Sequence, residues 1–268
     1  MQTDEVHRDS ATSVRRLYIL LAGFEVIPKT ISTRDRGARF TICSPICCYL
    51  LDTASGWILL DAGYDPLYSR DRELAERYFG STNMYPPVVE PMHELAFQLG
   101  EIGIGFADIR HVVLSHLHLD HTGYLKHLKH APVYIQRVEL AHGFSDARPV
   151  SYFPADYDAA DIDWQERDGD WELVPGLRLL ATRGHTPGHQ SALVDLAGSG
   201  TIVLPFDAGD LQENFSEEIL PGETVDDEAA LASIRRLNAL AARPRSRMIL
   251  FHDPVAIQSY KLAPDYYD

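Results

Sequence analysis

Cysteine is scarce in this chain. Only three of its 268 residues are cysteines, and Cys43, Cys47 and Cys48 lie together in one apolar run. An odd and low count argues against a disulfide framework and favours a reducing compartment, so a cytoplasmic protein is expected. We expect these thiols to be small buried apolar groups and not metal ligands or redox centres.

Basic residues and long apolar runs are also few. The chain carries 24 lysines and arginines against 39 acidic residues, a formal net charge of −15. Such a charge repels phosphate backbones and anionic lipid surfaces, so nucleic acid is not expected as a partner. The apolar run at residues 17–23 is too short to span a membrane, and no membrane association is expected.

The remaining composition fits one globular unit. Hydrophobic residues make up 45% of the chain, enough for a substantial core, and no low-complexity tract or linker divides it. We expect a flexible N-terminal arm over residues 1–16 and a single domain over residues 17–268.

Strands and helices are expected to alternate along this domain. The expected strands cover residues 17–22, 40–51, 56–61, 111–115, 133–135, 177–182, 191–196, 201–206 and 247–251, and the expected helices cover residues 66–78, 90–99, 124–129 and 226–242. Residues 147–170 show little periodicity and are expected to form a surface excursion that serves as a lid. The pattern predicts an α/β fold, a four-layer αβ/βα sandwich in which helices cover both outer faces of two packed sheets.

One short segment dominates the functional interpretation. Three histidines and an aspartate, His116, His118, Asp120 and His121, occupy six positions directly after the apolar run at residues 112–114. Imidazoles at i and i+2, followed at once by a carboxylate and a third imidazole, are typical of a metal site. The segment contains no cysteine and offers more ligands than one tetrahedral ion needs, which favours two ions.

Three later loops also follow apolar runs and can supply further ligands. They carry His185 and His189, Asp207, and His252. We expect these loops to meet the histidine segment at one edge of the fold.

The His-x-His-x-Asp-His pattern at residues 116–121 resembles the signature of the metallo-β-lactamase superfamily. Within it, the chain is similar to the N-acyl-homoserine lactonase branch in the stretches around residues 115–121, 135–137, 184–191 and 206–215. The resemblance implies that one metal is held by His116, His118 and His185, a second by Asp120, His121 and His252, and that Asp207 bridges both. It also implies that Asp61 is a buried aspartate that orients ligand histidines.

One position departs from the branch. Lactonases of this kind place a tyrosine three residues after the bridging aspartate, and here that residue is Asp210. Asp210 is either a solvated loop carboxylate or cap, or a changed substrate contact or proton carrier. Tyr64 and Tyr124 are alternative sources of the missing phenol but are expected to be ordinary aromatics of the core or pocket wall. His189 either acts in the pocket or satisfies hydrogen bonds in its loop.

The resemblance implies a metal-dependent hydrolase that opens a lactone ring, with an N-acyl-homoserine lactone as the expected substrate. Two divalent ions, Zn²⁺ in first place and Mn²⁺, Co²⁺ or Fe²⁺ as alternatives, would lower the pKa of a bridging water towards about 7, so that hydroxide would attack the carbonyl. Asp120 is the expected carrier of the proton to the leaving oxygen, and Asp210 is the second candidate catalytic residue.

Other functions remain open at this level. Hydrolysis of another lactone, of an aryl ester or of a phosphotriester is the first alternative, and an iron-dependent redox protein on the same scaffold is the second. A thioesterase for a glutathione conjugate would call for a basic cluster that is not seen, and a β-lactamase proper commonly uses a cysteine ligand, which is absent after Cys48. Phe24, Met84, Tyr85 and Phe153 are expected to line the pocket, and residues 86–92 are a candidate homodimer contact.

Overall fold

A long hairpin starts the first of two sheets. The computed structural model describes residues 12–81 and 84–268, and its first strands, β1 (Val14–Pro28) and β2 (Thr41–Thr53), pair antiparallel along their whole length. β3 (Gly56–Leu60) continues the meander, and β4 (Ile109–Val113), β5 (Val133–Gln136) and β6 (Trp164–Arg167) add in parallel, in the order β1-β2-β3-β4-β5-β6.

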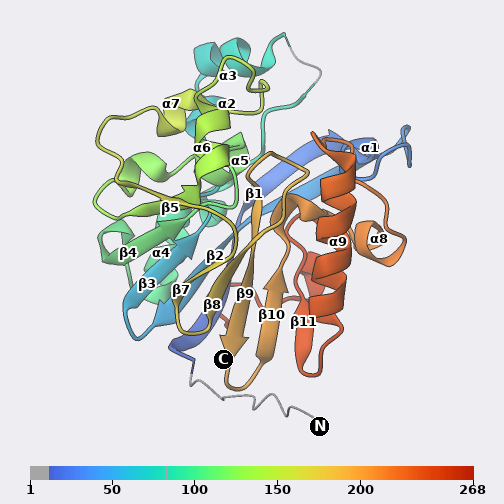
Figure 1. Cartoon of the computed structure of the whole chain (residues 1–268). Coiled ribbons are helices and arrows are strands. Elements are labelled where there is room, and N and C mark those ends of the chain that lie inside the picture. Colours follow the sequence, from blue (N-terminus) through green and yellow to red (C-terminus); the bar gives the residue numbers. More distant parts are fainter. Residues whose placement is uncertain (1–11, 82–83) are drawn as a thin grey trace.

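The second sheet has five strands in the order β11-β10-β9-β8-β7. β7 (Trp171–Val174), β8 (Leu177–Ala181), β9 (Gln190–Leu196) and β10 (Gly200–Leu204) form an antiparallel meander, and β11 (Ser246–Met248) lies parallel to β10. The two sheets face each other, with helices on the outer sides (Figure 1).

The helices are mostly short. They are α1 (Lys29–Ser32), α2 (Leu67–Arg70), α3 (Arg72–Phe79), α4 (Leu95–Ile102), α5 (Leu119–Thr122), α6 (Arg137–Gly143), α7 (Pro154–Tyr157), α8 (Gln212–Ser216) and α9 (Asp227–Ala241). None of the helices in the described part of the chain has the length and apolar character that crossing a bilayer requires.

Side-chain alternation along β1 and β2 separates the layers. Leu20 and Leu50 are fully buried in the same cluster as Leu95 of α4, whereas Ile19 belongs to the cluster that contains Val194 of the second sheet. Because successive side chains of a strand point to opposite faces, one hairpin serves both the helix-covered face and the interface between the sheets.

The outer face of the second sheet is covered by α9, which runs along it in Figure 1. Ile234 and Leu237 of this helix are fully buried against Leu193 and Val203. Helix, sheet, sheet and helix thus form four layers, and the predicted αβ/βα sandwich is confirmed.

Several boundaries differ from the sequence-based expectations. β1 begins at Val14, so residues 14–16 belong to the sheet and not to the expected arm, and residues 1–11 of that arm lie outside the described part. The helix expected over residues 66–78 is broken at Asp71, because its carboxylate accepts hydrogen bonds from the N–H groups of Glu73 and Leu74 and starts a new helix. Within residues 147–170, the structure has α7 and the edge strand β6, which pairs with β5, so this segment is not the irregular excursion expected.

The turns that matter for function follow strand ends. Asp61 follows β3, His116 follows β4 closely, His185 follows β8, Asp207 follows β10 and His252 follows β11. The fold therefore collects polar side chains from five strand ends.

Candidate metal centre

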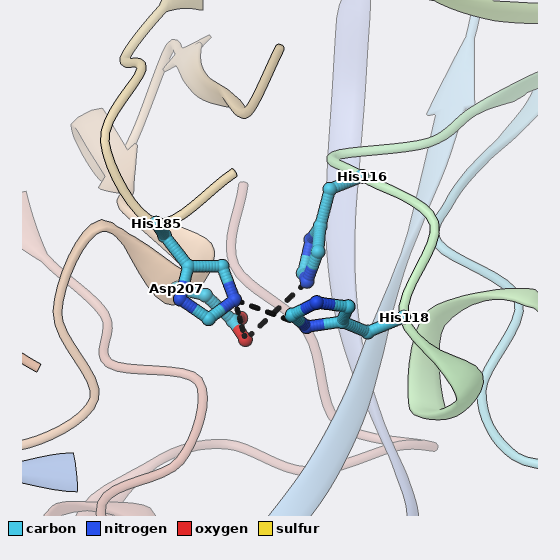
Figure 2. Close-up of side chains that lie close together, drawn as sticks. All are labelled: His116, His118, His185 and Asp207. Atoms are coloured by element: carbon cyan, nitrogen blue, oxygen red, sulfur yellow. Dashed lines mark hydrogen bonds and ion pairs between the residues drawn. The ribbon is translucent and has the colours of Figure 1, made fainter. Parts of the chain in front are cut away.

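Seven imidazole and carboxylate side chains come together near the ends of these strands. His116, His118, His185 and Asp207 form one group, and Figure 2 shows these four side chains converging from three loops. Asp120, His121 and His252 form a second group, and within each group the potential ligand atoms lie within 4.8 Å of one another. All seven side chains are buried. The structure thus brings together the seven side chains that the resemblance implied as metal ligands.

Asp207 lies between the two groups and offers one oxygen to each. Its Oδ2 lies 3.6 Å from Nε2 of His116 and 3.4 Å from Nε2 of His185. Its Oδ1 lies 3.4 Å from Nε2 of both His121 and His252. This is the arrangement expected of a carboxylate that bridges two cations.

The local backbone aims the ligands. α5 begins at Leu119, directly after His118, so Asp120 and His121 leave from its first turn while His116 and His118 leave from the extended segment before it. Phe206, next to the bridging aspartate, has φ 48°, a left-handed conformation that is strained for a residue with a large side chain. Such strain persists only where the surroundings hold it in place.

In four of the candidate ligand imidazoles, the Nδ1 nitrogen has a hydrogen-bond partner. The Nδ1 atoms of His116, His121, His185 and His252 lie 3.0, 2.7, 2.9 and 2.8 Å from Ser115 Oγ, Asp61 Oδ2, Glu223 O and Pro45 O, respectively. A hydrogen bond at Nδ1 fixes the ring orientation and leaves Nε2 available as a ligand atom.

Three polar atoms inside the centre lack hydrogen-bond partners. Nε2 of His116, Nε2 of His121 and Oδ1 of Asp207 are all buried in this condition. An unpaired buried polar group costs about 1–3 kcal/mol. Imidazole nitrogens and carboxylate oxygens that point at one another suit Zn²⁺, Mn²⁺, Co²⁺ or Fe²⁺, so the donor set fits two divalent ions.

The electrostatics of the imidazoles differ across the centre. Burial, reinforced by neighbouring imidazoles, lowers the pKa of His116 and His118 well below the usual histidine value, and a neutral imidazole is the form that binds metal. Burial also opposes the charged form of His121, but Asp120, Asp207 and Asp61 together raise its pKa well above the usual value. These three carboxylates thus favour the charged form of the His121 imidazole.

His189 does not line the pocket. Its Nδ1 lies 3.0 Å from Thr182 O, and its Nε2 accepts a hydrogen bond of 3.2 Å from the backbone N–H of Asp207. Burial, together with the neighbouring His185, lowers the pKa of His189 to about 3, which matches a neutral ring that donates at one nitrogen and accepts at the other. Of the two roles considered for His189, the structure favours hydrogen bonding in the loop, where it supports the backbone that carries Asp207.

A cleft opens over the two ligand groups. Besides ligands, it is lined by apolar side chains, by Ser44 and Ser151, and by three acidic side chains, Glu25, Asp210 and Glu223. No lysine or arginine of the described chain lines it. Burial and the nearby Asp120 raise the pKa of Glu25 to about 8, and burial raises the pKa of Asp210 to about 6.

The prediction of which residues line the cleft was only partly right. Met84 lines the cleft, but Phe24, Tyr85 and Phe153 do not. Phe24 packs against His93, Tyr85 is 68% exposed, and Phe153 stacks on Tyr78 in the neighbouring aromatic core. Aromatic character alone predicted burial near the site but not which cavity each ring faces.

Tyr64 and Tyr124 are core aromatics, as expected of them, and neither lines the cleft. Cys47 and Cys48 are free and buried, whereas Cys43 is exposed, contrary to the expectation that all three are buried.

Two residues near the site were missed altogether. Glu25 lies in the part of β1 beyond the predicted strand, and Glu139 is fully buried in α6 behind the ligand loops. The signal available in the sequence was that Glu25 is the one acidic residue in the apolar stretch of residues 22–28.

Comparison with known proteins agrees with this geometry. Residues 42–252 match the family model described as the metallo-beta-lactamase superfamily. An N-acyl homoserine lactonase of Bacillus cereus is 31% identical over 256 residues, which cover 95% of this chain and 99% of that protein. An N-acyl homoserine lactonase, AttM, of Azorhizobium caulinodans is 32% identical over 263 residues, with 94% and 98% covered.

Solved structures give the same result. The chain is similar to a Bacillus thuringiensis AiiA mutant with N-decanoyl-L-homoserine bound at its active site, with a TM-score of 0.85, 28% identity and coverage of 95% of this chain and 100% of that one. A similar match, with a TM-score of 0.86, 28% identity and the same coverage, is an N-acyl homoserine lactone hydrolase with the product N-hexanoyl-L-homoserine at its catalytic metal centre.

Proposed function

The chain belongs to the metallo-β-lactamase superfamily and is a hydrolase, and from this premise we propose that it opens the ring of N-acyl-homoserine lactones with two divalent ions. Its relatives that are about 30% identical over nearly their whole length bear the name N-acyl homoserine lactonase. Two of the similar structures hold the ring-opened product of such a lactone.

The observation that carries the proposal is the position of Asp207. One carboxylate faces two separate sets of ligands, His116, His118 and His185 on one side and Asp120, His121 and His252 on the other. Two divalent ions held by these residues would supply an activated water at neutral pH and would polarise a carbonyl oxygen, so that no nucleophilic side chain would be needed.

The cleft above the ions suits a neutral and partly apolar substrate. Ile27, Ile31, Met84, Leu119 and Pro221 offer apolar surface to an acyl chain. The acidic lining, without a cation, disfavours anionic substrates such as phosphodiesters or a glutathione conjugate. A lactone ring on a fatty acyl amide carries no charge and meets both conditions.

Asp120 and Asp210 are the proposed proton-handling and substrate-contact residues. The ion pairs of Asp120 with His121 and His252, at 3.2 and 3.5 Å, both use Oδ2, so we assign Oδ1 to carry the proton to the leaving alkoxide oxygen. Asp210 lines the cleft where lactonases of this branch place a tyrosine, and we assign it a contact with the substrate.

The identity of the ions belongs to the proposal. Imidazole and carboxylate ligands without thiolate accept Zn²⁺, and also Mn²⁺, Co²⁺ and Fe²⁺. Elemental analysis of protein purified without chelator, combined with the visible spectrum, separates zinc from an iron-dependent redox protein. Zinc at two equivalents with no visible absorbance is the expected result.

A hydrolysis screen tests the function. It compares short-chain and long-chain N-acyl-homoserine lactones, simple γ-lactones and δ-lactones, aryl esters and a phosphotriester, with the zinc, manganese and cobalt forms of the protein. The proposal requires that an N-acyl-homoserine lactone give the highest kcat/KM. Preference for an aryl ester or a phosphotriester over every lactone would contradict it.

The compartment and the assembly state are further parts of the proposal. The free, buried thiols of Cys47 and Cys48 support a reducing cytoplasm, which cell fractionation tests. Tyr85, Val88 and Met92 are 68%, 46% and 63% exposed and support a homodimer contact around residues 86–92, which sedimentation tests.

A further inference from the structure

Glu139 is a carboxylate buried behind the metal centre. It lies in α6, its side chain is fully buried, and its two oxygens accept four hydrogen bonds. Oε1 accepts from the N–H of Leu117 at 3.2 Å and from the hydroxyl of Tyr152 at 2.7 Å. Oε2 accepts from the hydroxyl of Thr186 at 2.7 Å and from the N–H of Gly188 at 2.9 Å.

These donors belong to the loops that carry one set of ligands. Leu117 stands between His116 and His118, and Thr186 directly follows His185. The segment around residues 116–118 follows β4 of the first sheet, and the segment around residue 185 is the loop that joins β8 and β9 of the second sheet. One side chain therefore ties together the two segments that supply all three imidazoles of the group that also contains Asp207.

The backbone packs as closely as the side chain. A Cβ added at Gly188 would lie 2.4 Å from the backbone nitrogen of Glu139, so this position admits only glycine without a shift of α6 or of the loop. The remaining donor, Tyr152, also contacts the metal centre, because its ring packs edge-on against His118, with centroids 4.9 Å apart and an interplanar angle of 89°. α6, the His185 loop and the segment at residue 152 thus form one packed unit.

The second group of ligands is tied by a different carboxylate. Asp61 contacts His121 directly and accepts hydrogen bonds from Ser115, whose hydroxyl also lies 3.0 Å from Nδ1 of His116, so Asp61 reaches the first group only through Ser115. None of the hydrogen bonds described for Glu139 is made with Asp120, His121 or His252. We infer that Glu139 is a positioning residue for one of the two ions, the one held by His116, His118 and His185. The inference rests on the proposed pair of ion sites and adds that Glu139 supports one ion alone, whereas Asp61 directly contacts a ligand of the other.

The test uses the full-length protein loaded with Co²⁺, whose visible absorption reports the geometry around each ion. Glu139→Gln keeps the shape but replaces one acceptor oxygen with an amide that faces donors. Loss of such an outer partner typically weakens metal binding by 10–100-fold. Chelator competition should show that loss for one of the two ions while the other keeps its wild-type affinity, with a changed visible band for the weakened ion.

Two other variants complete the assignment. Asp61→Asn should weaken mainly the ion that His121 helps to hold, because Asp61 contacts His121 directly and His116 only through Ser115, so that its cobalt difference spectrum differs from that of Glu139→Gln. Glu101→Gln removes the same charge from an exposed position in α4 and should leave both affinities and the spectrum unchanged. Wild-type affinity for both ions in Glu139→Gln, or equal weakening of both, would overturn the inference.

A milder pair of variants covers the case in which Glu139→Gln does not fold. Thr186→Val removes one donor to Glu139 and should weaken the same single ion to a smaller extent, and Thr186→Ser, which keeps a hydroxyl, should restore it. Equal metal binding by Thr186→Val and Thr186→Ser would contradict the inference. A wild-type protein that binds no ions would instead contradict the proposed function.

Discussion

Asp61 and His121 form a fully buried pair in which Oδ2 of the aspartate lies 2.7 Å from Nδ1 of the imidazole. The aspartate is itself held by Ser115, whose N–H and hydroxyl donate to its two oxygens at 2.6 and 2.8 Å. It also adopts a left-handed backbone conformation with φ 60°. This strained turn after β3 therefore sets the direction of a ligand that belongs to a segment 60 residues later.

Replacement of Asp61 tests that relationship. Both carboxylate oxygens of Asp61 accept hydrogen bonds, from Ser115 and from the imidazole N–H. In Asp61→Asn an amide replaces one of these oxygens, so His121 is no longer held in one orientation. We expect the ion held by His121 to bind 10–100-fold more weakly, measured by competition with a chelator, and the ion held by His116 to be affected less, because Asp61 reaches His116 only through Ser115. Asp265→Asn, at an exposed position, should bind both ions normally. Unchanged affinity in Asp61→Asn would show that the pair does not support the centre.

Removal of the shared carboxylate should affect both ions. Asp207→Ala takes away an oxygen from each ligand group, so we expect loss of both ions on elemental analysis and hydrolysis no faster than the metal-free background. The free energy of unfolding of the metal-free protein should change little, because the same substitution also removes the repulsion by which Asp207 raises the pKa of Asp120. His121→Ala should likewise lose hydrolysis, and Asp265→Ala serves as the control for both. Full activity of either active-site variant would rule out the shared centre.

The role of Asp210 is tested by substrate preference. Asp210→Tyr installs the residue that lactonases of this branch usually carry and removes an acid from the cleft lining. We expect the relative kcat/KM values across a panel of lactones to change while the metal content stays at the wild-type level. Unaltered relative rates would return Asp210 to the role of a bystander in its loop.

Asp156 predicts a specific pH dependence of stability. It is 4% exposed, accepts hydrogen bonds from Tyr68 and Thr122 at 2.6 and 3.1 Å, and burial raises its pKa to about 7. Because the folded state then binds a proton that the unfolded state has released, Asp156 costs stability as the pH rises from about 4 to about 7, by about 1.4 kcal/mol per pKa unit.

Asp156→Asn removes this titration and is the matched variant. The difference in unfolding free energy between the variant and the wild type, measured by urea denaturation of the metal-free proteins, should move in favour of the variant from pH 4 to pH 7 and stay level above pH 8. A difference that does not change with pH would show that Asp156 titrates normally.

The grouping of the seven candidate ligands was predictable because their signals in the sequence are local. His116, His118, Asp120 and His121 fall within six residues after an apolar strand, and His185, Asp207 and His252 each follow another apolar run. Strand ends at one edge of a sheet meet in space, so position after a strand is enough to predict proximity. The layer arrangement followed from the alternation of strands and helices for the same reason.

The surroundings of the ligands depend on pairings that one sequence does not reveal. β1 extends to Pro28 only because β2 pairs with it that far, and this extension carries Glu25 to the cleft. Residues 164–167 form a strand because β5 lies beside them, although their own pattern is not periodic. Glu139 appears as an ordinary helical acid until packing places four donors around it.

The most direct measurement is a titration of the metal-free protein with Zn²⁺ while the hydrolysis of N-hexanoyl-L-homoserine lactone is followed. The account predicts no activity without metal, a rise that levels off at two bound equivalents, and N-hexanoyl-L-homoserine as the product. Full hydrolysis by the metal-free protein, or none with two equivalents of zinc, manganese, cobalt or iron bound, would contradict it.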